Sequence, residues 1–294
     1  MKKRESDANL RLVPGGTPET ESDHPSSWSR PHVRSVAIAS GKGGVGKSTL
    51  AANLALALGE RGARVLLVDA DFSQANLDLL LGVHPRWDLS HVLQGEKSLE
   101  EIVVQGPTGV RLVPAASGSP ELADLDEYRL EVLWRGMSQL ENDADVVLVD
   151  TASGVHRSVT WLCRAAREVL VVTTPEMPAF SDAYALIKLL QKQGMTRPPH
   201  LVINHADGPE EAEETAHRIR LVARRFLSLD LDVWGSVPAD PAVARAVRLQ
   251  EPLITAFPHS PASIAIRALS EHLWDVVPPD PRVLPETQPQ RLEA

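Results

Sequence analysis

Between residues 34 and 240, short apolar runs alternate with longer stretches of helical pattern. Several runs, such as VLLVD, VVLVD and VLVVTT, place apolar residues at consecutive positions, which predicts strands buried on both faces. Such strands with helices between them predict a doubly wound α/β fold, a mostly parallel sheet flanked by helices. Ligands of such folds bind at the carboxyl ends of the strands, so the residues that follow each run are candidate site residues. We expect strands at residues 35–39, 64–69, 110–114, 145–150, 168–173, 200–204 and 231–237.

Prolines distinguish the two ends of the 294-residue chain from its middle. Of the 23 prolines, four lie within residues 1–34 and five within residues 278–294. A high proline content is typical of unpacked segments. We therefore expect a disordered leader at residues 1–33, one domain at 34–277 and a disordered tail at 278–294.

Charge and cysteine content exclude several classes of protein. The formal net charge of −9 argues against a constitutive binder of nucleic acid or anionic membranes. Cys163 is the single cysteine, so no intrachain disulfide and no site made of several thiolates is expected. No apolar run reaches the ~18 residues of a membrane-spanning helix, and the polar start contains no apolar signal segment. A cytoplasmic protein is the resulting expectation.

A phosphate-binding loop follows the first predicted strand. The string GKGGVGKST and the helix-forming run after it match G-x-x-x-x-G-K-[ST] in the strand, loop, helix context that this motif requires. Backbone N–H groups of such a loop surround phosphates, and the helix start adds the positive end of its dipole. Lys47 is expected to reach the β and γ phosphates and Ser48 to bind Mg²⁺. The nucleotide-binding candidates here are Gly41, Lys42, Gly43, Gly44, Val45, Gly46, Lys47, Ser48 and Thr49.

A second lysine, Lys42, follows the first glycine, although the general motif does not require it. The string KGGVGKST resembles the deviant Walker A motif of the MinD/ParA family of ATPases. The resemblance implies slow hydrolysis of ATP with Mg²⁺ and an ATP-dependent homodimer. It also implies that Lys42 crosses the dimer to contact the partner's nucleotide, much as an arginine finger does.

Two aspartates stand at the end of the second predicted strand. In the resembled family the second aspartate of such a D-x-D pattern orients or activates the attacking water, a role that falls to Asp71. Asp69 would support Mg²⁺ and the geometry of this switch, with Asn76 as a weaker contact. The alternative is an Asp-rich turn that caps the next helix.

Asp150 ends the apolar strand at residues 145–150 and resembles a Walker B acid held near Mg²⁺ through water. Gly154 fits the second switch of the family and would offer its N–H to the γ phosphate. Ala152 and Ser153 depart from the family pattern, which bears on the hydrolysis rate more than on nucleotide binding.

The resemblance also assigns the adenine contacts. Asn204 ends one predicted strand, and Pro238 and Asp240 follow another. In the family these places hold adenine, which favours ATP over GTP. Residues 204–207, NHAD, nearly match the guanine motif N-K-x-D, so GTP stays a minor alternative. Asp240 would also cap the helix that follows it.

Further strings look most like the FlhG/FleN flagellar-number regulators, among them DADFSQANLDLLLG and VLVVTTPEMPAFSDAYALIKLL. This branch implies control of flagellar number or placement through a protein partner, such as a flagellar GTPase or a basal-body or regulatory protein. Septum-site placement, partition of chromosomes, plasmids or other cargo, and a scaffold with a vestigial ATPase are the alternatives.

Membrane and DNA are the less favoured partners. The helix-like run at residues 261–277 has a single arginine, Arg267, so we expect it to pack on the sheet, with peripheral contact at the inner face of the membrane at most. The basic cluster at residues 217–225 ends a predicted helix whose start is acidic. That order suits the helix dipole and gives the cluster a structural explanation.

Overall fold

The structure, a computed structural model, describes residues 34–118, 125–195 and 197–276. The leader predicted at residues 1–33 and the tail predicted at 278–294 lie outside the described residues. The strands are β1 (Arg34–Ser40), β2 (Val65–Ala70), β3 (Val104–Gln105), β4 (Arg111–Val113), β5 (Val146–Ser153), β6 (Glu168–Thr173), β7 (His200–Ala206) and β8 (Val233–Pro238). The helices are α1 (Lys47–Glu60), α2 (Leu77–Leu81), α3 (Leu89–Leu93), α4 (Leu99–Ile102), the 3-10 turn η1 (Pro107–Gly109), α6 (Glu127–Gly136), α7 (Ser138–Glu141), α8 (Arg157–Ala165), α9 (Met177–Lys192), α10 (Pro209–Leu227), α11 (Pro241–Leu249), α12 (Leu253–Ala256) and α13 (Pro261–Val276).

The strands form one eight-stranded sheet in the order β3-β4-β2-β5-β1-β6-β7-β8. All neighbouring pairs are parallel except β3 and β4, which are antiparallel. The predicted mostly parallel sheet is confirmed. The sequence did not predict β3, because a two-residue edge strand is too short to produce a hydrophobic pattern.

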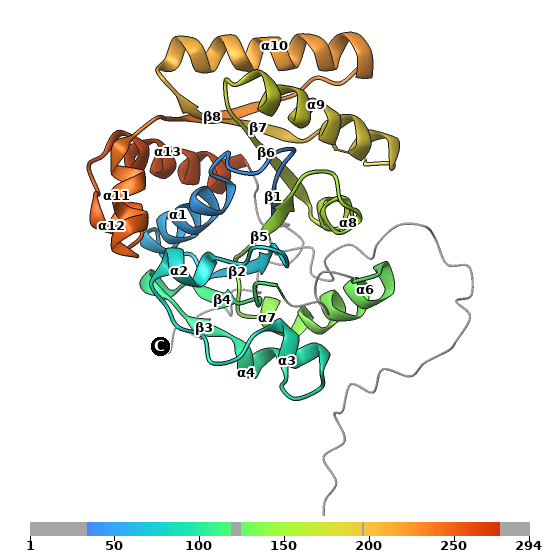
Figure 1. The fold of residues 1–294 in the computed structure, drawn as a ribbon, viewed down its shortest axis with the longest axis vertical. Helices are drawn as coiled ribbons and strands as arrows, with labels where there is room; N and C mark the ends of the chain where they lie inside the picture. Colours follow the sequence, from blue (N-terminus) through green and yellow to red (C-terminus); the bar gives the residue numbers. More distant parts are fainter. Residues whose placement is uncertain (1–33, 119–124, 196, 277–294) are drawn as a thin grey trace, which may run out of the picture.

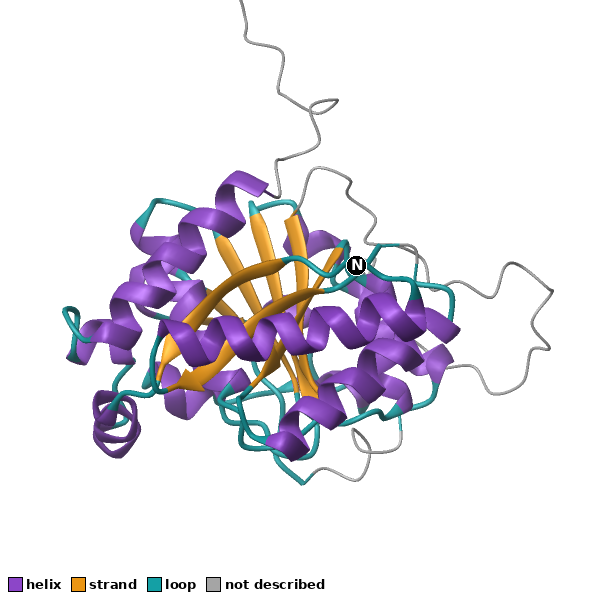
Figure 2. Ribbon diagram, turned by 90° about the horizontal axis from the view of Figure 1, so that it is seen from above, coloured by secondary structure: helices purple, strands orange, loops and turns teal. Residues whose placement is uncertain are grey.

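Helices cover both faces of this sheet (Figures 1 and 2). Val65 and Leu67 of β2 belong to a core with α1, α11, α12 and α13, whereas Leu66 and Val68 belong to a core with α3, α4, α6, α7 and α8. Helices α8, α9 and α10 cover the second face beside β1, β6 and β7. The consecutive apolar residues of the strands follow from this arrangement, because neighbours in a strand point to opposite, equally buried faces.

Helix α13 packs against α1 and β8, as predicted for the last helical run. Its Leu269 and Leu273 are buried in the core of the first face. The guanidinium of Arg267 binds both carboxylate oxygens of Glu60 in α1, at 2.8 and 3.0 Å. Within the described ranges, no helix combines the length and apolar character needed to cross a membrane.

The parallel sheet brings the carboxyl ends of β2, β5, β1, β6 and β7 side by side. Asp69 of β2 and Asp150 of β5 are partners in the strand register. The loop after β1 leaves the sheet next to β5. Candidate residues far apart in the sequence therefore meet at one edge of the sheet.

Candidate functional site

The loop between β1 and α1 has the conformation that its glycines allow. Gly44 and Gly46 have φ values of 81° and 84°, which favour glycine over any residue with a side chain. A Cβ atom at Gly46 would collide with the side-chain amide of Asn204, and one at Gly41 would collide with the backbone of Asp182 in α9. Two glycines of the motif are thus also needed for close packing of the loop against β7 and α9.

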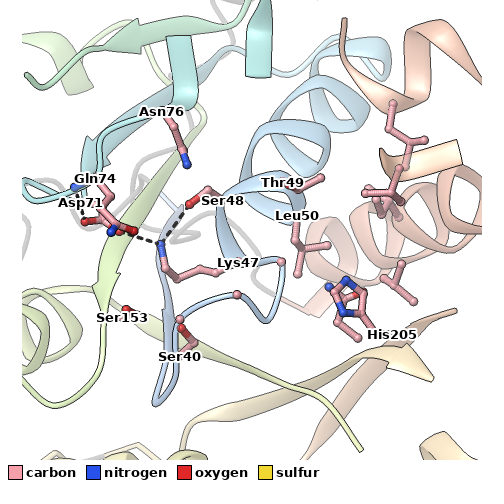
Figure 3. A pocket seen from close by; sticks show the side chains of 18 residues that line it. Ser40, Lys47, Ser48, Thr49, Leu50, Asp71, Gln74, Asn76, Ser153 and His205 are labelled. Carbon is pink, nitrogen blue, oxygen red and sulfur yellow. Dashed lines mark hydrogen bonds and ion pairs between the residues drawn. The ribbon is translucent and has the colours of Figure 1, made fainter. Parts of the chain in front are cut away.

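Lys47 is the electrostatic centre of the site (Figure 3). Its Nζ lies 2.6 Å from Oδ1 of Asp150 and 3.9 Å from Oδ2 of Asp71. The same nitrogen donates a hydrogen bond of 3.3 Å to Oγ of Ser48. Lys47 is only 5% exposed, so these interactions are little screened by solvent. The structure brings together four residues that the sequence placed in one site.

Asp150 has the chemistry of an acid that supports a metal. It is 0% exposed, and burial raises the pKa of its carboxyl group while Lys47 acts to lower it. Among the described residues, its Oδ1 receives the Lys47 bond and its Oδ2 has no hydrogen-bond partner. Within the same ranges no group of three or more His, Cys, Asp or Glu side chains forms a metal cage. This donor set fits Mg²⁺, which at phosphate sites is held by one or two carboxylates, phosphate oxygens and water.

Asp69 holds the backbone of the loop that carries Asp71. Its Oδ1 accepts the N–H of Asp71 at 3.2 Å, and its Oδ2 accepts the N–H groups of Asn76 and Leu77, each at 3.1 Å. Burial and the nearby Asp150 raise the pKa of Asp69 to about 8. Asp69 does not line the cavity, so its visible role is to position the loop, and its support of Mg²⁺ stays a prediction.

Asp71 lines the cavity and faces Lys47. Its Oδ1 accepts hydrogen bonds from Oγ of Ser73 at 2.8 Å and from the N–H of Gln74 at 3.0 Å. These two bonds orient the carboxylate so that Oδ2 points toward the lysine. The geometry leaves one oxygen of Asp71 on the side where a terminal phosphate or its attacking water would lie.

The segment predicted as the second switch lies at the end of β5. Gly154 has a φ of 94°, and its N–H donates to the carbonyl of Ser40 at 2.8 Å. The predicted bond from this N–H to a γ phosphate would require that contact to open. Ser153, noted in the sequence only as a departure from the family pattern, lines the cavity beside Gly43.

Lys42 lies outside this cluster and points to the surface. Its Nζ pairs with Oε2 of Glu176 at 3.1 Å, and the two side chains are 37% and 69% exposed. An exposed pair of this kind contributes at most about 1 kcal/mol, so Lys42 is easily released. The two lysines of the motif therefore lie in different environments, because Lys47 is buried and Lys42 is exposed.

The cavity has a volume of about 410 Å³, within the usual range of small-molecule sites. Asn204 lies where its amide donates to the carbonyl of Val45 at 2.8 Å, and so ties β7 to the phosphate loop. The described residues that line the cavity are Ser40, Gly43, Gly44, Gly46, Lys47, Ser48, Thr49, Leu50, Asp71, Gln74, Asn76, Ser153, Asn204, His205, Val237, Val243, Leu253 and Ile266.

Both carboxylate oxygens of Asp240 accept hydrogen bonds from the first turns of helices. Its Oδ1 accepts the N–H of Ala242 in α11 at 2.8 Å, and its Oδ2 accepts the N–H of Ala262 in α13 at 3.1 Å. Although burial opposes it, these two bonds lower the pKa of Asp240. Neither Asp240 nor Pro238 lines the cavity, so their adenine contacts remain predictions.

Four apolar residues from the C-terminal part of the described chain line the cavity in place of Pro238 and Asp240, and the sequence did not identify them. Val237 comes from β8, Val243 from α11, Leu253 from α12 and Ile266 from α13. They are spread over four elements and match no local pattern. Only the packing of α11, α12 and α13 on β8 and α1 brings them to the site.

Comparisons with known proteins show the family of the chain. The CobQ/CobB/MinD/ParA nucleotide binding domain family matches residues 36–253. Antiactivator FleN of Pseudomonas aeruginosa is 42% identical over 253 residues, which cover 85% of this chain and 90% of that protein. Flagellum site-determining protein YlxH of Helicobacter pylori is 34% identical and covers 74% of each chain.

Solved structures have the same fold. The septum site-determining protein MinD of Pyrococcus horikoshii, complexed with Mg-ADP, superposes with a TM-score of 0.68 at 27% identity. The match covers 82% of this chain and 96% of that one. By its sequence, its sheet and its phosphate loop, the chain belongs to the CobQ/CobB/MinD/ParA nucleotide-binding family, as a MinD/ParA-type ATPase similar to FleN and YlxH.

Proposed function

We propose that this protein is a switch that binds ATP with Mg²⁺, dimerises in the ATP-bound form and returns to the monomer on hydrolysis. The observation that carries the proposal is the contrast between its two lysines. Lys47 is buried among Asp71, Asp150 and Ser48, whereas Lys42 lies at the surface in a weak pair with Glu176. In this proposal Lys47 would hold phosphate within the subunit, and Lys42 would leave its exposed pair to reach a second subunit.

The proposed hydrolysis uses residues of the described site. Lys47 and the loop N–H groups would bind the β and γ phosphates. Bound Mg²⁺, supported by Ser48 and Asp150, would neutralise charge on those phosphates. Asp71 would orient a water whose oxygen bonds to the γ phosphorus while the bond to the β–γ bridging oxygen breaks, leaving ADP and inorganic phosphate. The carboxylate of Asp71 would accept a hydrogen bond from that water.

We further propose that the switch controls the number or placement of flagella through a protein partner in the cytoplasm. Support comes from the names of its relatives, an antiactivator and a flagellum site-determining protein. DNA is less favoured, because the net charge is −9 and the basic end of α10 follows an acidic first turn, an order that suits the helix dipole. Peripheral contact with the membrane would be secondary.

The dimer can be tested directly. Light scattering after size exclusion, with ATP and Mg²⁺, should find a dimer for Asp71→Ala, because binding is kept and hydrolysis is blocked. Adding Lys42→Ala to that variant should return it to the monomer with unchanged thermal stability, since the Lys42–Glu176 pair is exposed. A monomer for Asp71→Ala at saturating ATP would contradict the switch.

Two further measurements separate the alternatives. Phosphate release that disappears in Lys47→Ala would exclude a scaffold with a vestigial ATPase. Deletion of the gene should change the number or position of flagella per cell, whereas a change confined to septa or to chromosome inheritance would favour the septum-site or partition alternative.

A further inference from the structure

His205 occupies an extra position in the β7–β8 ladder. The register pairs Asn204 with Val237 and Ala206 with Pro238, so His205 has no place of its own opposite β8. Its φ of 58° is in the left-handed region, which is uncommon for a residue other than glycine. Bulges of this kind redirect a side chain and occur often beside active sites. A strained residue beside a cavity therefore suggests a function for its side chain.

The side chain of His205 lies at the end of the cavity opposite the acidic residues. Figure 3 shows Asp71, Gln74 and Asn76 on one side, His205 on the other, and the loop with Lys47 between them. Nε2 of His205 is 3.2 Å from the position that a Cβ atom of Gly46 would take, so the ring lies over the last glycine of the loop. A nucleotide with its terminal phosphates at Lys47 would extend toward His205.

The other residues at this end suit a flat apolar ring better than a phosphate. Val237, Val243, Leu253 and Ile266 line it, while the amide of Asn204 is engaged with the carbonyl of Val45. His205 is exposed and lines the same cavity, so its imidazole borders the open side of a compartment lined by these apolar residues together with Thr49 and Asn204. An aromatic ring there would cover the face of a base that the apolar wall leaves open.

We propose that the imidazole of His205 packs against the base of the bound nucleotide and sets the affinity for it. The inference rests on the proposed function, because it requires the cavity to bind a nucleotide. Stacking of a base on an aromatic side chain is tolerant of base identity. His205 should therefore set how tightly nucleotides bind more than which base is chosen.

The test compares ADP with inorganic pyrophosphate, which has the phosphates but no base, by titration calorimetry on the full chain with Mg²⁺. His205→Ala should weaken ADP binding about tenfold, which corresponds to the lower part of the range for losing one stacking contact. Its affinity for pyrophosphate should be unchanged. His205→Asn should weaken ADP binding equally, because asparagine tolerates a positive φ but has no ring. His205→Phe, which keeps a ring, should bind ADP within about threefold of wild type.

The control is His217→Ala, which removes another exposed histidine, on α10, and should leave both affinities unchanged. Equal losses for ADP and pyrophosphate in His205→Ala would overturn the proposal in favour of a phosphate contact. If His205→Asn binds ADP with wild-type affinity, the proposal is overturned, because the positive φ at this position and not the ring would then set the affinity. If the wild-type chain binds no nucleotide, the proposed function itself fails, whereas tight binding unaffected by His205→Ala refutes only this inference.

Discussion

The two ends of the cavity differ in the chemistry of the residues that line them. At the phosphate end, Lys47, Asp71 and Asp150 are buried and linked by ion pairs. At the end that we propose for the base, the lining includes Val237, Val243, Leu253 and Ile266, with the polar residues Thr49, Asn204 and His205. The first end carries buried charges of both signs, which can interact with a charged ligand. The second end offers a shaped and largely apolar surface. Substitutions should therefore have larger effects at the phosphate end than at the base end.

The largest expected effect belongs to Lys47→Ala. Removing this ammonium group leaves the carboxylate of Asp150 fully buried without its cation, which should reduce the free energy of unfolding by about 3–5 kcal/mol. Urea denaturation of the nucleotide-free protein would measure the loss. Adding Asp150→Asn to the variant removes the unpaired charge and should recover most of it. If the unfolding free energy of Lys47→Ala falls by less than about 1 kcal/mol, substitutions at the two ends of the cavity differ less in their effects than the buried charges predict.

A smaller effect is expected for Asn204, which connects the end of β7 to the phosphate loop. Asn204→Ala leaves the carbonyl of Val45 without its donor in a buried position, and should lower the free energy of unfolding by about 1–3 kcal/mol. The exposed Asn142→Ala is the matched control, with an expected change below about 0.5 kcal/mol. Equal unfolding free energies for the two variants would mean that the bond to Val45 does not hold the loop.

Per pH unit, the smallest expected effect is the pH dependence of stability that comes from Asp69. Its pKa of about 8 in the folded state lies above the value of about 3.9 in an unfolded chain, so between these values the folded state keeps a proton that the unfolded state has released. Its contribution to stability therefore falls as pH rises. The unfolding free energy of Asp69→Asn minus that of wild type should increase between pH 5 and 8, by at most about 1.4 kcal/mol per pH unit. Parallel profiles from urea denaturation without nucleotide would contradict the raised pKa.

The same contrast explains what the sequence could predict. The phosphate loop is one contiguous string, and Asp69 and Asp150 end recognisable buried strands, so local patterns were sufficient to place them together. Val243, Leu253 and Ile266 come from three helices whose packing no local pattern encodes. Asp240 illustrates the limit, because its position predicted a helix cap correctly, yet its second oxygen caps α13, 22 residues further along the chain. His205 was visible in the sequence only as a mismatch to a guanine motif, since its bulge depends on the register of β8.

Gly41 has a consequence beyond phosphate binding. A side chain at this position would collide with the backbone of α9 at Asp182, whether or not a nucleotide is present. The first glycine of a ligand-binding motif is thus required here by the packing of a helix. The exposed pair between Lys42 and Glu176, the residue before α9, brings the loop and this helix together at a second point. A displacement of α9 would therefore change the space that the backbone of the loop occupies.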